Sequence, residues 1–350
     1  MITAELRRAI LAAAGVGAVS AEDADPLLRP GPAPGSYASH LPFRLPPPGQ
    51  DPRDLAALLA GRLAREPWIA AAEVTGPGFL TVTVTHDALA GLAVRIARAG
   101  PACARSDALR GRTLPAAPPG PPAALDWPQA QAALAAQLTA RLAAAAGATV
   151  YIDAERASVP APVPLPAARS EGLPPAQPIP LPAAGPVAEA ARYAGADAVR
   201  FALARMPPGG PAGGRAPNAA VIARHVLANP AYAVRYAHAA AAAVLRWAAA
   251  LGTRPAGFTP RLLAEPEELP LLDALSWLPE RVAMAARRGR PDEFAGYLEE
   301  LAARTIETMS TTSFTTVSSI SSERLWLADA VRTGLAVGLR LLGIDAPSRL

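Results

Sequence analysis

The chain has 350 residues, a formal net charge of +4, 51% hydrophobic residues and only 5% aromatic residues. Its length allows two or three domains with separate cores, and its 40 prolines exclude an unbroken helical array, so linkers are expected. All 33 basic residues are arginine. A single cysteine, Cys103, excludes a disulfide framework, and the four scattered histidines lack metal-ligand spacing, so we expect no metal and no other cofactor.

Residues 4–18 are predicted to form an amphipathic helix. Arg7 and Arg8 precede an apolar run, as in a secretory signal, but Glu5 interrupts the positive region and the run is weak, which favours the helix. No apolar run reaches the roughly 20 residues that span a bilayer. We therefore expect no membrane association and a cytoplasmic location.

The first unit is expected to extend to residue 110 and to be α+β, with a small mixed or antiparallel sheet. A proline-rich loop at residues 26–50 precedes Asp51 and Pro52, which supply a helix cap and a first-turn proline. Leucines then recur at helical spacing and predict one buried stripe: Leu55, Leu58, Leu59 and Leu63.

Two strands and a closing helix complete this unit. Residues 69–74 and 79–85 are predicted strands joined by Gly-Pro-Gly, and the second alternates apolar with polar residues, as in a sheet with one wet face. Residues 86–99 are predicted to be helical, with His86 or Asp87 as the cap.

Residues 111–186 are interpreted mainly as a Pro/Ala-rich linker. Within it, Asp126 starts an alanine-rich helix that ends at Gly147, and residues 149–152 form a candidate strand. This pair is too short for an independent nucleotide-binding fold, so we expect a small remnant packed on a neighbour.

Residues 187–350 are predicted to form an all-α antiparallel bundle. Asn229 and Pro230 restart the chain as cap and first-turn residue, and Gly343 ends the last helix. The predicted helices cover residues 187–205, 217–227, 230–251, 269–288, 292–312 and 322–342.

The charges are unevenly distributed in this bundle. Residues 191–263 contain nine arginines against one acid, Asp197, whereas residues 264–350 contain nine arginines against thirteen acids. A polyanion would be attracted to the first block. The alternative is a solvated helix face whose counter-charges lie nearby in space.

Three segments resemble bacterial arginyl-tRNA synthetases. Gly-Ser-Tyr-Ala-Ser at residues 35–39 and Val-Thr-Gly-Pro-Gly-Phe-Leu at residues 74–80 are similar to the family's N-terminal domain, which touches the D-loop corner of tRNA. Gly-Ala-Asp-Ala-Val-Arg-Phe-Ala-Leu at residues 195–203 resembles the DALR start of the anticodon-binding bundle. The third is Asn-Pro-Ala-Tyr-Ala-Val-Arg-Tyr-Ala-His at residues 229–238, with Leu-Leu-Gly-Ile-Asp-Ala-Pro-Ser-Arg at residues 341–349.

The resemblance implies an organisation in three parts. Residues 1–110 would be an arginyl-tRNA synthetase N-terminal-like domain, residues 111–186 a linker with a catalytic-domain remnant, and residues 187–350 a DALR-like anticodon-binding bundle. It is greatest to actinobacterial arginyl-tRNA-synthetase-related anticodon-binding proteins, which lack the class I catalytic domain.

The sequence departs from the family at its catalytic motifs. A class I synthetase uses HxGH imidazoles and a KMSK lysine to hold ATP phosphates during adenylation, and this chain has neither motif. Arg235 stands where the family usually has Gln. The Ser/Thr-rich residues 307–319 replace a segment that is usually aromatic, and this removes surface on which bases stack.

The helix at residues 230–251 carries most of the candidate RNA-binding residues. Arg235 and Arg246 are eleven residues apart and share a face, which His238 flanks, while Tyr236 and Trp247 share a neighbouring face. A basic ridge with an aromatic edge is typical of RNA contact. Alternatively, the two aromatic residues belong to the core and the arginines are solvated. The remaining candidates, also by resemblance, are Tyr37 and His40 in the N-terminal loop, Arg224 and Tyr232.

Three functions remain open. The first is a non-catalytic tRNA-binding protein related to arginyl-tRNA synthetase. The second is a protein-interaction module derived from the synthetase with RNA binding lost, which the altered residues 307–319 favour. The third is a working arginine–tRNA ligase, against which the missing motifs argue. The expected partner is tRNA, with a protein partner as the alternative.

Overall fold

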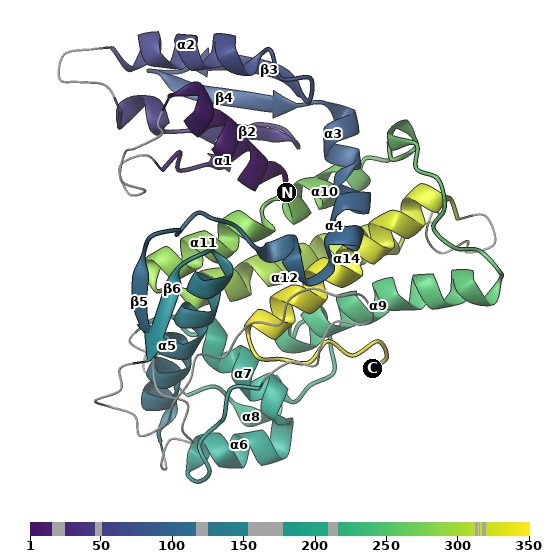
Figure 1. The fold of residues 1–350 in the computed structure, drawn as a ribbon. Coiled ribbons are helices and arrows are strands. Elements are labelled where there is room, and N and C mark those ends of the chain that lie inside the picture. The colour runs from purple at the N-terminus through teal and green to yellow at the C-terminus, as the bar shows by residue number, and fades with distance from the viewer. Residues whose placement is uncertain are drawn as a thin grey trace.

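A computed structural model describes residues 1–15, 25–45, 51–116, 125–152, 178–208, 216–311, 314, 316 and 320–350. In Figure 1 an α+β unit lies above a helical bundle, and a β–α–β element lies along one side of the bundle. One continuous cluster of buried hydrophobic side chains includes residues from all three parts. This arrangement confirms the predicted fold class: a small sheet with helices, followed by an all-α bundle.

The sheet of the N-terminal unit has four strands in the order β1-β2-β4-β3, each antiparallel to its neighbours. They are β1 (Arg29–Pro30), β2 (Ser36–Ser39), β3 (Ile69–Thr75) and β4 (Phe79–Val84). The predicted strands β3 and β4 are confirmed. The prediction of a loop was wrong at Ser36–Ser39, because these residues form a ladder with β4, a long-range partner that local composition does not indicate.

Two of the four helices of this unit begin at a side-chain cap. They are α1 (Ile2–Ala13), α2 (Pro52–Leu63), α3 (His86–Ala90) and α4 (Leu92–Ala99), with short 3-10 turns η1 (Leu41–Phe43) and η2 (Gly100–Ala104). Asp51 caps α2 as predicted, with its carboxylate accepting from the Arg53 N–H at 2.9 Å. The cap of α3 is Thr85, not His86 or Asp87, and the predicted helix is interrupted at Gly91.

The middle segment is a minimal β–α–β element. Strands β5 (Thr113–Ala116) and β6 (Thr149–Ile152) pair in parallel, and α5 (Trp127–Ala145) connects them. Asp126 and Gln129 form a capping box at the start of α5. Strand β5 was not predicted because it contains Pro115, which a two-stranded sheet tolerates since each strand is an edge. Helix α5 packs on α7 and α11.

The bundle contains most of the helices. They are α6 (Pro186–Ala194), α7 (Ala196–Arg205), α8 (Ala219–Ile222), α9 (Pro230–Ala250), α10 (Glu268–Ser276), α11 (Leu278–Arg288), α12 (Pro291–Met309) and α14 (Ser322–Leu341), with η4 (Pro260–Leu262). The helix predicted over 187–205 divides at Gly195, whose φ of +89° ends α6. The one predicted over 269–288 divides before Pro279, which lacks an N–H.

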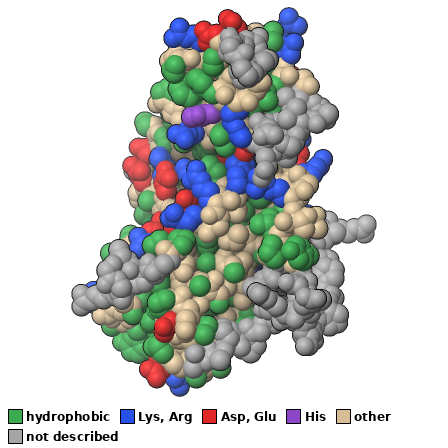
Figure 2. All heavy atoms as spheres, turned by 90° about the vertical axis from the view of Figure 1, so that its left-hand side faces the viewer, with side chains coloured by type: hydrophobic (Ala, Val, Ile, Leu, Met, Phe, Trp, Pro, Cys, Tyr) green, Lys and Arg blue, Asp and Glu red, His purple; other side chains and the backbone are tan. Residues whose placement is uncertain are grey.

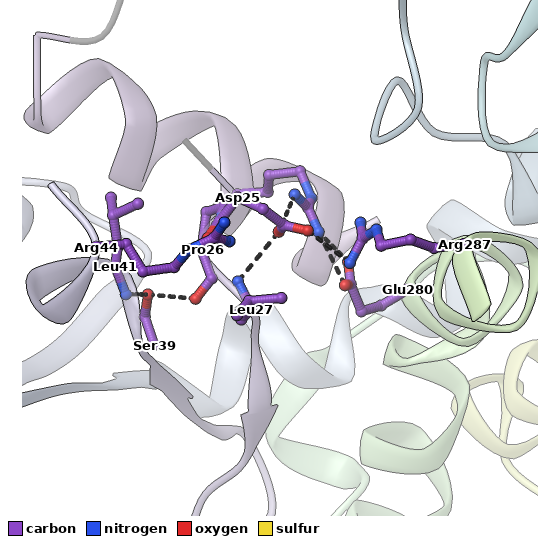
Figure 3. Close-up of polar contacts among 9 residues, drawn as sticks. Asp25, Pro26, Leu27, Ser39, Leu41, Arg44, Glu280 and Arg287 are labelled. Atoms are coloured by element: carbon purple, nitrogen blue, oxygen red, sulfur yellow. Dashed lines mark hydrogen bonds and ion pairs between the residues drawn. The ribbon is translucent and has the colours of Figure 1, made fainter. Parts of the chain in front are cut away.

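A buried ion-pair group joins the N-terminal unit to the bundle (Figure 3). The Arg7 guanidinium donates to Asp25 at 2.6 Å and to both Glu280 oxygens at 2.8 and 2.9 Å. Arg287 lies 2.5 Å from the other Asp25 oxygen. Burial raises the pKa of Asp25, but Arg7, Arg287 and the Leu27 N–H outweigh it, so the pKa lies below its usual value.

Further hydrogen bonds extend the same junction. The Tyr37 hydroxyl lies 2.8 Å from Ser276 Oγ, and Thr3 Oγ1 donates to the Ser276 carbonyl at 2.8 Å. The Gly35 N–H donates to Asp273 at 2.9 Å. The two units are therefore held directly against each other.

In the part of the chain that the structure describes, every helix is too short or too polar to cross a bilayer.

We expect Arg7→Met to lower the free energy of unfolding by about 3–5 kcal/mol, because it leaves the buried Glu280 carboxylate without its partner and Asp25 with Arg287 alone. The double variant Arg7→Met/Glu280→Met should recover part of this loss, because it removes both charges of a pair. Urea unfolding measures both effects, with the exposed Arg65→Met as the matched control. A double variant less stable than the single one would contradict a pair-specific role.

Candidate nucleic-acid interface

Helix α9 has a buried face and an exposed face. Its alanine-rich sequence allows close packing against α12 and α14, with Ala231, Val234 and Ala241 in the core. Tyr236 and Trp247 are 38% and 56% exposed, so the interpretation of both as core residues was wrong. The solvent side of α9 therefore carries large aromatic side chains that the core does not use.

Three aromatic rings form a stack at the start of α9. The His225 and Tyr232 rings lie 5.4 Å apart with an interplanar angle of 11°, and the Tyr232 and Tyr236 rings lie 5.9 Å apart at 28°. Tyr232 and Tyr236 align because they are one helical turn apart. His225 and Tyr236 are exposed and Tyr232 is half-buried. We call His225, Tyr232 and Tyr236 the aromatic ladder; its rings present faces on which bases can stack.

Asn229 fixes the loop that carries His225. It was predicted to cap α9, but its side chain makes no capping bond among the described residues. Its amide nitrogen instead donates to the carbonyls of Ile222 and Arg224, at 2.9 and 2.7 Å. This pair of bonds holds the end of the α8 loop against α9 and so positions the His225 ring beside Tyr232. The Arg224 side chain remains exposed.

Arg235, which precedes Tyr236 on α9, lines a cavity. The cavity has a volume of about 420 Å³ and is also lined by Arg200, Asp197, Asp345 and the first residues of α7. Arg200 donates to Asp197 at 2.8 Å and to the Ile179 carbonyl at 2.8 Å. Arg235 Nε is buried and has no hydrogen-bond partner among the described residues. A guanidinium and a helix N-terminus at one cavity are groups that can hold a phosphate.

His238 and Arg246 hold the C-terminal segment against α9. His238 is 3% exposed, and its Nδ1 lies 2.9 Å from the Pro347 carbonyl oxygen. Burial, assisted by Arg332 and Arg340 and opposed by the Pro347 carbonyl, lowers the pKa of His238 to about 4. Arg246 Nη1 donates to the Ser348 carbonyl at 2.5 Å. The ridge predicted from Arg235, Arg246 and His238 is therefore corrected at His238, which is a core residue. Arg246 holds the tail but is only half-buried, so RNA contact at this residue stays a prediction.

The two N-terminal candidates lie far from α9 in the fold. Tyr37 on β2 is fully buried, its ring 5.3 Å from that of Trp277, and burial raises its pKa. Because no surface of Tyr37 is accessible, the expected RNA contact at this residue is corrected to a structural role between sheet and bundle. His40 packs edge-on against Phe79 at 4.8 Å and stays partly exposed, with its pKa lowered by burial and by Arg29.

Other sequence predictions fall partly outside the described residues. Residues 312, 313, 315 and 317–319 of the altered segment lie outside them, whereas Phe314 is buried. Within the described ranges no group of three His, Cys, Asp or Glu residues is placed to hold a metal ion.

Sequence reasoning missed His225, Asp197 and Asp345 as parts of this site. The spacing of seven residues between His225 and Tyr232 crosses a loop, so helical periodicity does not align them. Asp345 reaches the cavity only through the packing of the C-terminal segment on α7, where its N–H donates to Asp197 at 3.3 Å.

Comparison with known protein families matches the two ends of the chain. Residues 1–84 match the arginyl tRNA synthetase N terminal domain, and residues 234–350 match the DALR anticodon binding domain. The chain is 40% identical over 136 residues to the arginine–tRNA ligase of Clavibacter sepedonicus, covering 37% of this chain and 24% of that protein. It is 43% identical over 128 residues to that of Kineococcus radiotolerans, covering 35% and 23%. The chain thus aligns with about a quarter of the length of these relatives.

A solved structure shares the fold. The arginyl-tRNA synthetase of Thermus thermophilus superimposes with a TM-score of 0.65 and 15% identity, over 100% of each chain. At this identity the likeness concerns the fold alone. The sequence matches, however, identify both end domains as arginyl-tRNA synthetase-like.

The environment of His238 predicts a pH dependence of stability. The folded-state pKa of about 4 lies below the ordinary 6.5, so folding favours the neutral ring. The contribution of the neutral ring to the free energy of unfolding is complete above pH 6.5. It falls by up to roughly 3 kcal/mol as the pH decreases toward 4. Urea unfolding at several pH values should show the stability difference between wild type and His238→Gln shrinking over this window. Parallel curves for the two proteins would contradict a buried neutral imidazole.

Proposed function

We propose that this protein, whose two end domains are arginyl-tRNA synthetase-like, binds tRNA without aminoacylating it. The observation that carries the proposal is the aromatic ladder, together with Arg235 on the same helix α9: stacking faces for bases and a guanidinium for phosphate. Tyr236 of the ladder lies in the segment that matches the DALR anticodon binding domain, residues 234–350, and His225 and Tyr232 come shortly before it. Rings stacked at the surface are not covered by the protein core, whereas unpaired bases of an RNA loop would bury them.

The chemistry of the middle segment supports the non-catalytic part of the proposal. Neither an HxGH motif nor any lysine is present in the sequence. Between the end domains the structure has a β–α–β element with strands of four residues each. Helix α5 of this element packs on α7 and α11, so its apolar face completes the bundle.

We expect alanine at both Tyr232 and Tyr236 to weaken tRNA binding by about 5- to 150-fold for each base that no longer stacks, which corresponds to roughly 1–3 kcal/mol. Fluorescence anisotropy with labelled tRNA transcripts at low salt measures the affinity. The matched control is Tyr193→Ala, which removes a 68% exposed tyrosine of α6 outside the ladder. Thermal unfolding of each variant separates binding from folding. Equal weakening in the control would refute a specific role for the ladder, and no affinity of the wild type would refute RNA binding.

The catalytic question has its own test. With arginine, ATP and tRNA, we expect no ATP–pyrophosphate exchange above a protein-free blank, because no lysine or HxGH pair is present to stabilise the phosphates. A working arginine–tRNA ligase assayed in parallel confirms the sensitivity of the measurement. Exchange that scales with the concentration of this protein would overturn the non-catalytic proposal.

A protein partner is the second candidate function. Three apolar side chains lie exposed near the ladder in and after α8: Val221, Val226 and Leu227 are 49%, 47% and 50% exposed. Such a patch also suits protein docking. Stoichiometric copurification of one protein, with an absorbance ratio free of nucleic acid, would favour this candidate over tRNA.

A further inference from the structure

Helix α9 presents an apolar stripe to solvent along its whole length. Its members follow one another at spacings of three or four residues, so they share one face of the helix: Tyr232, Tyr236, Ala240, Ala243, Trp247 and Leu251. We call these six residues the apolar stripe. Tyr236, Trp247 and Leu251 are 38%, 56% and 60% exposed, and the other three are half-buried. At the rise of a helix the stripe is about 30 Å long.

The apolar stripe contains no charged residue. The charged residues of α9 are Arg235 and Arg246, which lie to one side of the stripe, and the helix contains no acid. Residues 221–227, which include His225 beside Tyr232, add three exposed side chains: Val221, Val226 and Leu227. Six of the thirteen large hydrophobic side chains that are exposed in the described ranges thus lie within residues 221–251. Such a concentration of exposed apolar residues indicates an interaction site.

The order of the residues makes the stripe complementary to itself. Two alanines occupy its middle, an aromatic residue follows on each side, and a large side chain stands at each end. When a second α9 lies antiparallel across it, Tyr236 meets the partner's Trp247, Ala240 meets the partner's Ala243, and Tyr232 meets the partner's Leu251. Each pairing then occurs twice, as a two-fold axis requires. The alanines let the two backbones approach closely, and the aromatic rings cover large side chains on both sides of them.

The opposite side of the molecule is less suited to a second copy. Figure 2 shows the side that carries the β–α–β element, where basic side chains gather in a band across the middle. Two such bands would repel each other, and the formal net charge of +4 adds to this repulsion. In Figure 1 helix α9 extends to the opposite side of the molecule. A contact between two apolar stripes therefore keeps the basic bands of the two copies apart.

We infer that two copies of this chain associate through their apolar stripes, with the α9 helices antiparallel about a two-fold axis. An unrelated helix would need an apolar face to bind here, but it would not require matching residues at equal distances from the middle of the stripe. A contact one helix wide buries less than the about 1,600 Å² of a standard interface. The dimer is accordingly reversible, with a Kd on the order of 10 µM.

Dimerisation also bears on the aromatic ladder, because Tyr232 and Tyr236 belong to the ladder and to the stripe. The second copy covers these two rings, so a dimer cannot stack RNA bases on them. RNA and the second copy therefore compete for one surface. This competition rests on the proposed function, whereas the self-association does not.

Sedimentation velocity over about 1–200 µM protein, a range that brackets the expected Kd, tests the self-association. We expect Ala240→Glu and Ala243→Arg each to weaken dimerisation about tenfold or more, because each places an unpaired charge in the middle of the contact. Both residues are half-buried in α9, where Glu and Arg are good helix formers, so folding should persist and thermal unfolding checks it. The matched control is Ala249→Glu, an exposed position of α9 outside the stripe, which should dimerise like the wild type.

Mixing the two single variants tests the antiparallel arrangement. Position 240 of one copy meets position 243 of the other, so an equimolar mixture of Ala240→Glu and Ala243→Arg should recover dimers that neither variant forms alone. A mixture no stronger than the separate variants would refute this arrangement. A wild type that stays monomeric over the whole range would overturn the inference. Dimers that neither substitution weakens would place the contact on another face and would overturn it as well.

Transfer RNA separates this inference from the proposed function. Adding a tRNA transcript should convert wild-type dimers into complexes of one protein with one tRNA, and tRNA bound to intact dimers would refute the competition. A wild type that binds tRNA but never dimerises would overturn the inference and leave the proposed function standing. Dimers that bind no tRNA would leave the self-association standing and refute the proposed function.

Discussion

The Arg7 guanidinium, buried between Asp25 and Glu280, is the interaction on which the arrangement of the molecule depends. It comes from α1 and reaches α11, 273 residues later in the chain. A buried charge of this kind adds little net stability over an apolar pair, but it tolerates only one relative position of its partners. The hydrogen bonds of Gly35, Tyr37 and Thr3 to α10 form in the same relative position of the two units. The relative position of the two end domains, and therefore the spacing of every surface on them, follows from this junction.

Helix α9 separates its structural and binding roles by face. Small residues let α12 and α14 approach closely, so the helix is fixed over its whole length without large side chains. His238 and Arg246 were plausible RNA ligands by residue type, and both contact carbonyls of the last residues of the chain. That segment in turn brings Asp345 and Gly343 to the cavity of Arg235. The tail is thus part of the proposed RNA surface, although its contacts with α9 are structural.

The sequence predicted those features that depend on local chemistry. Asp51 and Pro52 define the start of α2, alternation defines β4, and Gly343 with φ +72° ends α14, all as expected. Features that depend on distant partners were not predictable. Strand β2 exists because β4 pairs with it, and Tyr37 is buried because α10 covers it. The same limit applies to the site: helical spacing paired Tyr236 with Trp247, whereas the contact of Tyr232 with Tyr236 was not predicted. The ring of His225 joins them only through the Asn229 bonds across a loop.

The exclusive use of arginine bears on what the surface can do. A guanidinium remains charged even when buried and offers five N–H donors in a plane, whereas a lysine ammonium at the same place would shed its proton more readily. Arg7 and Arg287 exploit this property, since both stay in a crowded, desolvated group. Adenylate chemistry in the class I synthetases that the sequence resembles relies instead on the mobile point charge of a lysine. A chain whose basic side chains are all guanidinium groups is thus suited to binding phosphates in fixed positions.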